Sequence, residues 1–286
     1  MKILLKTINK SNRADLHNHT TASDGLLSPY QLIEYAVKKN LDAVAVTDHD
    51  TIDGIEEALN AGEKYGIEVI PGIEINTQLN SKEIHILGYY IDWKSSHLQN
   101  ILKKMKDARI SRAKRMIENL NKLYGLDVSY DEVVYQSKNG IIGRMHLARI
   151  LVSKGIVNDI SEAFNKYLGT ESPAYVKRYH LTPEEGISLI NKVGGVAILA
   201  HPGLLPDPFL LNIILDIGID GIEVFHSKHT EEQTEYYEKI AIENKLLITG
   251  GSDCHGELIN GFPTVGDVTV DMEKVISLRN RANRKK

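Results

Sequence analysis

Residues 14–19 read Ala-Asp-Leu-His-Asn-His, and this stretch is the clearest indication of the fold. Its pattern is typical of a short β-strand that ends in two histidines. Residues two apart in a strand point to the same side, so the imidazoles of His17 and His19 can converge on one ion. The stretch therefore predicts a strand whose end carries paired metal ligands.

Six further runs along the chain share this β-like character. Most are rich in Val and Ile and nearly continuous in apolar residues, which favours strands buried on both faces. With the first stretch, the runs cover residues 14–19, 43–48, 68–75, 83–90, 195–200, 221–225 and 246–250. Helical patterns lie between many of them. Strands that alternate with helices predict an α/β fold with a parallel sheet or a barrel.

Helix signals fall between these runs and at the end of the chain. Ser28 followed by Pro29 is typical of an N-cap and a first helical position. A second helix is predicted over residues 51–65, and Thr182 with Pro183 marks the start of another. The basic tail over residues 279–286 is predicted to be frayed.

The alternation breaks between residues 97 and 180, where the pattern is almost wholly helical. Residues 97–124 hold eight Lys or Arg against two acidic residues, a net charge of +6. This charge fits either a solvated helix face or a guide for phosphate-bearing substrates. We predict that residues 1–96 and 181–286 form the α/β body and that residues 97–180 form a helical insert over one mouth of it.

Composition limits the class of protein. The 286 residues are 42% hydrophobic and 25% charged, which is ordinary for a soluble globular protein. The single cysteine excludes an internal disulfide and a multi-cysteine zinc site. No run approaches the roughly 18 apolar residues of a membrane helix, and the first 13 residues lack a signal-peptide core. We expect a cytoplasmic protein with no membrane partner, and the net charge of −4 argues against wholesale nucleic-acid coating.

Nearly every predicted strand ends in a histidine or a carboxylate, and the loops after barrel strands build active sites. Imidazoles and carboxylates together suit zinc, iron or manganese. The candidate metal ligands are His17, His19, Asp24, His49, Glu74, His85, His201, Asp253 and His255. Cys254 lies between two of them, so pleat alternation points it away from the site. We expect a bound metal cluster, with Cys254 as a buried inert thiol.

Five motifs in this series resemble those of the PHP (polymerase and histidinol phosphatase) superfamily. They are Asp15-Leu16-His17-Asn18-His19, Thr47-Asp48-His49-Asp50, Gly72-Ile73-Glu74, Ala200-His201-Pro202 and Gly251-Ser252-Asp253-Cys254-His255. The resemblance covers about residues 1–95 and 190–270. It implies a distorted seven-stranded (β/α) barrel with a helical insert, and a metal-dependent phosphoesterase.

Three further stretches resemble one branch of this superfamily. They are Gly143-Arg144-Met145-His146-Leu147-Ala148-Arg149 in the helical segment, residues 200–203 and residues 221–226. The branch includes phosphatases of nucleoside 3′,5′-bisphosphates and 5′-to-3′ exonucleases acting on short RNA. The implied partner is a small phosphorylated nucleotide or short RNA, with no obligate protein partner.

The resemblance also implies how the ligands are shared among two or three divalent ions, Mn²⁺, Zn²⁺ or Fe²⁺. A first ion would be held by His17, His19, Glu74 and Asp253. Glu74 would bridge to a second ion, completed by His85 and His201. A third would be held by Asp24, His49 and His255. Family members often have His where Asp24 stands, so this site is expected to be weaker or to favour manganese. Asp48 is expected to orient a ligand imidazole.

The implied reaction is attack of metal-activated hydroxide on phosphorus, with Asp253, His226 and Arg144 as catalytic residues. Arg144 would hold phosphoryl oxygens, because its planar fork donates two parallel hydrogen bonds. Arg149 and His146 are further candidates for substrate binding. His226 would donate a proton to the leaving group or contact phosphate. The alternatives are a surface arginine pair on a helix and a core histidine.

Three other functions stay open at this point. The substrate could be histidinol phosphate or another small phosphomonoester. The chain could be a non-catalytic PHP binding module, although all nine proposed ligands are chemically competent. It could also bind nucleic acid through the basic helix of residues 97–124.

Overall fold

The computed structural model describes residues 12–136, 142–177, 179–259 and 261–285. The chain forms two compact units. The first comprises the residues up to Leu98 and those from Leu181 onward, and the second runs from Gln99 to His180. The first division lies two residues after the boundary predicted at 96/97, and the second is the same as the one predicted at 180/181. No helix in the described ranges is long and apolar enough to cross a membrane.

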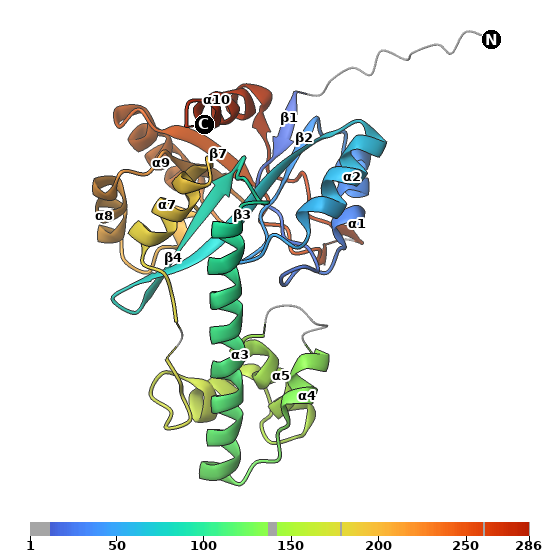
Figure 1. Cartoon of the computed structure of the whole chain (residues 1–286), viewed down its shortest axis with the longest axis vertical. Helices are drawn as coiled ribbons and strands as arrows, with labels where there is room; N and C mark the ends of the chain where they lie inside the picture. The colour runs from blue at the N-terminus through green and yellow to red at the C-terminus, as the bar shows by residue number, and fades with distance from the viewer. Residues whose placement is uncertain (1–11, 137–141, 178, 260, 286) are drawn as a thin grey trace, which may run out of the picture. The chain divides into compact units, whose positions relative to one another are not determined.

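The first unit is built on a sheet that curls into a nearly closed barrel (Figure 1). The order of its strands is β10-β1-β2-β3-β4-β5-β6-β7. Their bounds are β1 (Arg13–Asp15), β2 (Ala43–Val46), β3 (Glu68–Leu79), β4 (Lys82–Tyr89), β5 (Val196–Leu199), β6 (Gly221–His226), β7 (Leu247–Gly251) and β10 (Val270–Asp271). The Leu16 N–H, just after β1, donates to the Gly250 carbonyl oxygen of β7 (3.2 Å) and links these two strands across the barrel opening. The predicted distorted α/β barrel is confirmed.

The sequence pattern anticipates seven of these strands, and β10 is an addition that runs antiparallel to β1. β1 is shorter than predicted. His17 and His19 follow it in a segment that contacts the β7 end through one parallel bridge, Asn18 to Cys254. A separate small hairpin pairs β8 (Leu258–Ile259) with β9 (Phe262–Pro263).

The alternation of strand and helix fails between β3 and β4. A tight turn joins these strands, and both turn residues, Asn80 and Ser81, have positive φ (48° and 66°) as short hairpin turns require. β4 therefore runs antiparallel to β3 and β5, while β1–β2–β3 and β5–β6–β7 are parallel. The reversed strand places His85 in the middle of a strand rather than at an end.

Helices flank the barrel strands. They are α1 (Pro29–Lys38), α2 (Ile55–Tyr65), α7 (Pro183–Lys192), α8 (Phe209–Ile217), α9 (Glu231–Glu243) and α10 (Met272–Asn283), with a 3-10 turn η2 (Pro202–Leu204). The predicted N-caps are confirmed, because the hydroxyls of Ser28 and Thr182 accept the N–H groups of Gln31 and Glu185. Gly66 ends α2 in a left-handed conformation, with φ +73°.

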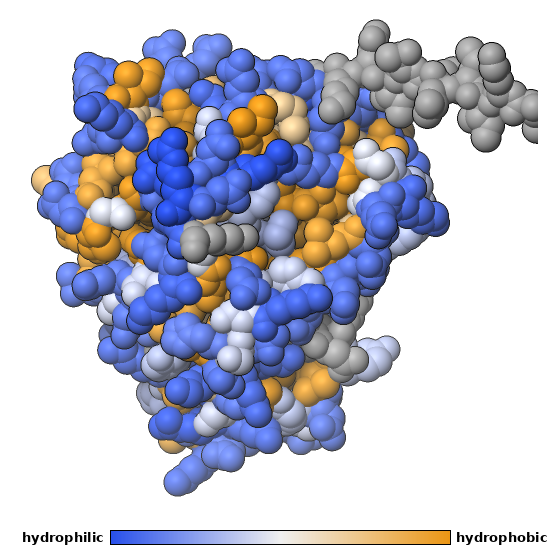
Figure 2. Space-filling model, turned by 45° about the horizontal axis from the view of Figure 1, so that its top comes forward, coloured by the Kyte–Doolittle hydropathy of each residue, from blue (hydrophilic) through white to orange (hydrophobic). Residues whose placement is uncertain are grey.

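The helix α10 is part of the barrel core. Its buried residues Val275, Leu278 and Ala282 pack with inward-facing side chains of the strands. The predicted fraying is wrong over the described part of the tail, because Lys285 pairs with the barrel residue Asp220. Figure 2 shows mostly hydrophilic side chains on the surface turned forward, with hydrophobic ones in patches among them.

The second unit is helical and has a core of its own. It contains α3 (Ser96–Tyr124, from Gln99), α4 (Tyr130–Gln136), α5 (Arg144–Ser153), α6 (Ile160–Ala163) and a π-helical turn η1 (Phe164–Leu168). Its core includes Met116, Leu120, Val133, Leu147 and Leu151. The idea that this segment covers the mouth of the barrel stays a prediction.

Candidate metal centre

Glu74 of β3 lies at the centre of the site and is only 1% exposed. Its Oε1 lies 2.9 Å from His85 Nδ1 and 3.1 Å from His201 Nε2. Its Oε2 lies 3.0 to 3.3 Å from ring nitrogens of three more histidines: His17, His19 and His49. One carboxylate thus contacts five imidazoles with two oxygens, the arrangement expected of a ligand that bridges two ions.

Asp253, just after β7, closes one side of this group. Its Oδ1 lies 3.2 Å from His19 Nε2 and 3.5 Å from His17 Nε2. Its backbone has φ +51°, an uncommon conformation for a residue other than glycine. The structure therefore brings together the four residues expected to hold the first ion.

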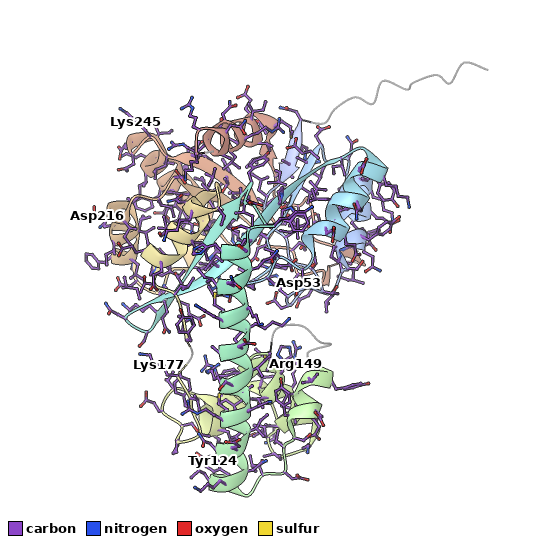
Figure 3. The ribbon with its side chains drawn as sticks, in the orientation of Figure 1. Asp53, Tyr124, Arg149, Lys177, Asp216 and Lys245 are labelled. Atoms are coloured by element: carbon purple, nitrogen blue, oxygen red, sulfur yellow. The ribbon has the colours of Figure 1, made fainter. Side chains whose placement is uncertain are left out.

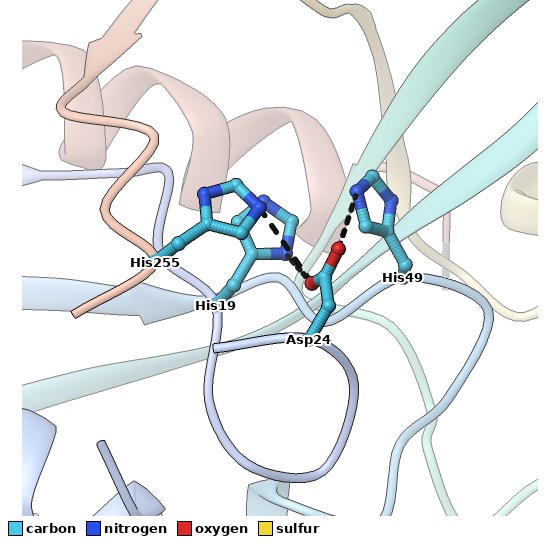
Figure 4. Close-up of side chains that lie close together, drawn as sticks. All are labelled: His19, Asp24, His49 and His255. Carbon is cyan, nitrogen blue, oxygen red and sulfur yellow. Dashed lines mark ion pairs between the residues drawn. The ribbon is translucent and has the colours of Figure 1, made fainter. Parts of the chain in front are cut away.

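The outer side of the site is formed by Asp24 and three imidazoles (Figure 4). The Asp24 carboxylate oxygens lie 3.6 to 3.8 Å from ring nitrogens of His19, His49 and His255. Such distances are long for hydrogen bonds, but ligands about 2.0–2.2 Å from one ion are separated by about this much. Asp24 is 46% exposed, so this side is more open to water than the Glu74 side.

The residues present fit a group of metal ions. Both ring nitrogens of His19 and the Nδ1 of His49 are buried without a hydrogen bond of acceptable geometry, although carboxylates lie nearby. A buried ring nitrogen without a hydrogen bond lowers the stability of the fold unless a metal ion or another group binds it. Within the described residues, four groups of His, Asp and Glu have ligand atoms within 4.8 Å of one another, and together they include eight of the nine predicted ligands. The ninth, His201, contacts Glu74.

The charges of the site are strongly coupled. Burial raises the pKa of Glu74, but the neighbouring imidazoles outweigh it and hold that pKa well below its usual range. Burial lowers the pKa of His19, yet Asp253 and Glu74 raise it to about 10. Without metal, protons on imidazoles such as that of His19 balance the negative charges of the carboxylates. Metal ions compete with protons for the same nitrogens, so metal binding here releases protons.

Two hydrogen bonds orient imidazoles of predicted ligands. His17 Nδ1–H donates to Glu223 Oε1 of β6 (2.9 Å), which leaves Nε2 to face Glu74 and Asp253. His255 Nδ1–H donates to the Asp253 carbonyl oxygen (3.0 Å), which leaves Nε2 to face Asp24. Sequence reasoning missed Glu223, although a lone acidic residue in an otherwise apolar strand was a usable signal.

Among the described residues, Asp48 contacts no imidazole of a predicted ligand, although orienting one is the role expected from the sequence. Its carboxylate accepts the Thr20 N–H, the Thr20 hydroxyl and the Ser23 hydroxyl, at 2.5 to 2.7 Å. It therefore holds the loop that carries Asp24, rather than a ligand imidazole. Cys254 is buried in a hydrophobic cluster with Leu32 and Val44, as predicted.

His226 lies against Asp253, one of the predicted ligands. Its side chain is fully buried, its Nε2 lies 3.3 Å from Asp253 Oδ2, and its Nδ1 accepts the Lys228 N–H. This arrangement favours a histidine that positions Asp253. His229 has both nitrogens occupied by backbone groups of Val224 and Gly203, so it is structural.

The other predicted substrate contacts belong to the second unit. Arg144 donates to the Leu168 carbonyl oxygen (3.2 Å), and its guanidinium lies over the rings of Phe164 and Tyr175. His146 accepts the Gly143 N–H at the start of α5. Arg149 is exposed on the same helix (Figure 3).

The chain is similar to several known proteins and to one protein family. The model of the PHP domain family matches residues 15–170. A 5′-3′ exoribonuclease of Haemophilus influenzae is 36% identical over 86% of this chain and 90% of its own. A 3′,5′-nucleoside bisphosphate phosphatase of Chromobacterium violaceum is 33% identical over 84% and 86%. The crystal structure of a candidate metal-dependent phosphoesterase from Bifidobacterium adolescentis superposes with a TM-score of 0.79 at 33% identity, over 94% and 96% of the two chains.

The barrel and its histidine-rich centre define a metal-dependent phosphoesterase. The chain belongs to the PHP domain family, and the family predicted from the sequence motifs is confirmed.

Proposed function

We propose that this phosphoesterase removes phosphate from small nucleotides, with nucleoside 3′,5′-bisphosphates as its main substrates. Short 5′-phosphorylated oligonucleotides are further substrates in this proposal. The observation that carries it is the convergence of five imidazoles on Glu74, with Asp253 beside them. The named relatives act on bisphosphates and on RNA, and they support the choice of substrate class.

The proposal assigns two or three Mn²⁺, Zn²⁺ or Fe²⁺ ions to the centre. The first would be held by His17, His19, Glu74 and Asp253, the second by Glu74, His85 and His201, and the third by Asp24, His49 and His255. When bound, such ions lower the pKa of water toward about 7 and neutralise phosphoryl oxygens. The chain's own residues fix the spacing of the ligand atoms, and His226 positions Asp253 through its Nε2, which lies 3.3 Å from Asp253 Oδ2.

The test is phosphate release by the manganese-loaded chain from four compounds: a nucleoside 3′,5′-bisphosphate, a 5′-mononucleotide, histidinol phosphate and a short 5′-phosphorylated RNA. We expect the bisphosphate to be preferred. Asp253→Asn removes one ligand charge, so it should lose nearly all turnover together with metal at the first position. Asp267→Asn is the matched control, because this exposed carboxylate pairs only with Lys39 among the described residues.

The results of this assay distinguish the proposed function from its alternatives. Full turnover by Asp253→Asn would contradict the metal mechanism. Preference for histidinol phosphate would keep the centre and replace the substrate. Faster release from RNA than from the bisphosphate would favour an exonuclease. Absence of release by fully metal-loaded protein would favour a non-catalytic module.

We also propose that Arg144 contacts substrate phosphate, with Arg149 and His146 as neighbours of that contact. The Leu168 carbonyl and two aromatic rings hold the Arg144 guanidinium, and this fixes its direction in the second unit. A hydrogen bond to a charged group contributes about 1.5–3 kcal/mol. Arg144→Ala should therefore lower kcat/KM about 10- to 100-fold, mainly through KM, with metal content intact. Arg115→Ala, an exposed arginine of α3, is the control. Loss of metal in Arg144→Ala would assign a structural role instead.

A further inference from the structure

Glu223 lies inside the barrel in the middle of β6 and is fully buried. The strands beside it, β5 and β7, are parallel to β6. A buried carboxylate is costly unless its oxygens accept hydrogen bonds. Glu223 has such partners on both oxygens, and each partner belongs to a proposed metal ligand.

The first partner is the side chain of His17. Glu223 Oε1 lies 2.9 Å from His17 Nδ1, and a carboxylate can only accept, so this ring nitrogen carries the proton. The nitrogen of His17 left to bind a metal ion is then Nε2, which faces Glu74 at 3.3 Å and Asp253 at 3.5 Å. Contact with a carboxylate fixes the tautomer of a ligand histidine and raises its basicity.

The second partner is the backbone of His201. The His201 N–H donates to Glu223 Oε2 (2.8 Å). His201 has φ +27° and ψ 61°, a backbone conformation that side-chain-bearing residues rarely adopt. The hydrogen bond therefore holds a ligand whose backbone would otherwise relax, and it does so two residues after the end of β5.

The charge of Glu223 agrees with this arrangement. Burial raises the pKa of its carboxyl, but attraction to His17, His226 and His201 outweighs burial and lowers the pKa below the usual value. The Glu223 carboxylate thus adds a buried negative charge beside His17 and His201.

We propose that Glu223 is a positioning residue that couples two metal positions: it fixes the tautomer of His17 at the first and the backbone of His201 at the second. This inference rests on the proposed metal centre. The outer position of Asp24, His49 and His255 has no described contact with Glu223, so it should not depend on it.

Glu223→Gln separates this role from simple packing. Glutamine keeps the shape but offers one acceptor oxygen, and its NH₂ cannot accept from the His201 N–H. We expect metal affinity at the first two positions to fall about 10- to 100-fold, as when outer contacts of ligand histidines are lost. Competition with a chelator, followed by metal analysis, measures this. Tyr89→Phe is the control, because it removes another interior hydrogen bond, to the Leu16 carbonyl oxygen, and leaves imidazole nitrogens untouched.

Metal affinity of Glu223→Gln within twofold of the wild-type value would overturn the inference. An equal loss in Tyr89→Phe would also overturn it, since general destabilisation would then explain both. If Glu223→Gln does not fold, ¹⁵N NMR of the metal-free wild-type chain decides, because a proton on His17 Nε2 rather than Nδ1 excludes the proposed role. A wild-type chain that binds no metal would instead contradict the proposed function.

Discussion

Glu74→Gln is expected to lower kcat by about 10³-fold, comparable with the loss of a fixed charge-stabilising group in other enzymes. The reason is geometric. The two oxygens of Glu74 face five imidazole nitrogens at 2.9 to 3.3 Å. Glutamine replaces one oxygen by an NH₂ group that cannot bind a metal ion, and it removes the negative charge shared by the first two positions. Metal content should therefore fall with activity.

The measurement is single-substrate kinetics beside metal analysis of the same preparation. Glu63→Gln on the exposed surface of α2 is the control, because it changes the same group without a contact to the centre. Circular dichroism establishes that both variants are folded. Wild-type turnover with unchanged metal content in Glu74→Gln would contradict the bridging role of this carboxylate.

Leu278→Ala is expected to lower the free energy of unfolding by about 2–5 kcal/mol, the usual cost of truncating a fully buried leucine. Leu278 of α10 is 0% exposed and packs in the barrel core. Urea unfolding of the two proteins measures the difference. Ile276→Ala on the same helix is the control, since Ile276 is 48% exposed and its truncation should change stability by about 0.5 kcal/mol or less.

Equal and small effects in the two α10 variants would contradict the placement of this helix in the core. A large effect confined to Leu278 would establish that the basic end of the chain is a structural part of the barrel.

Most of the barrel could be predicted from sequence because its strands are short, apolar and followed by chemically distinctive residues. His17 and His19 show this well, since they follow directly on the first predicted strand and both reach Glu74, although the strand itself ends at Asp15. The reversed strand β4 could not be predicted in the same way. Its direction follows from the Asn80–Ser81 turn, and the apolar pattern of a buried strand is the same in both directions.

The hydrogen bonds that orient the predicted ligands join residues that are far apart in the sequence. Glu223 and His17 are 206 positions apart, so only the closed barrel brings them together. The amphipathic end of the chain is a similar case. Its Lys and Arg residues dominate the local composition. The spacing of Val275, Leu278 and Ala282 indicates a buried helix face only when the strands of the barrel are present to pack against it.

The pairing of β1 with β10 has a consequence for the order of biosynthesis. Arg13 and Asp271 are partners in the sheet, and Asp15 accepts the Ser252 and Gly266 N–H groups. A nascent chain on the ribosome therefore carries His17 long before Asp253 exists to face it. Since domains are made from the N-terminus onward, the barrel closes late in translation. The full set of predicted ligands therefore exists only after synthesis has passed His255, and the strand that pairs with β1 follows still later.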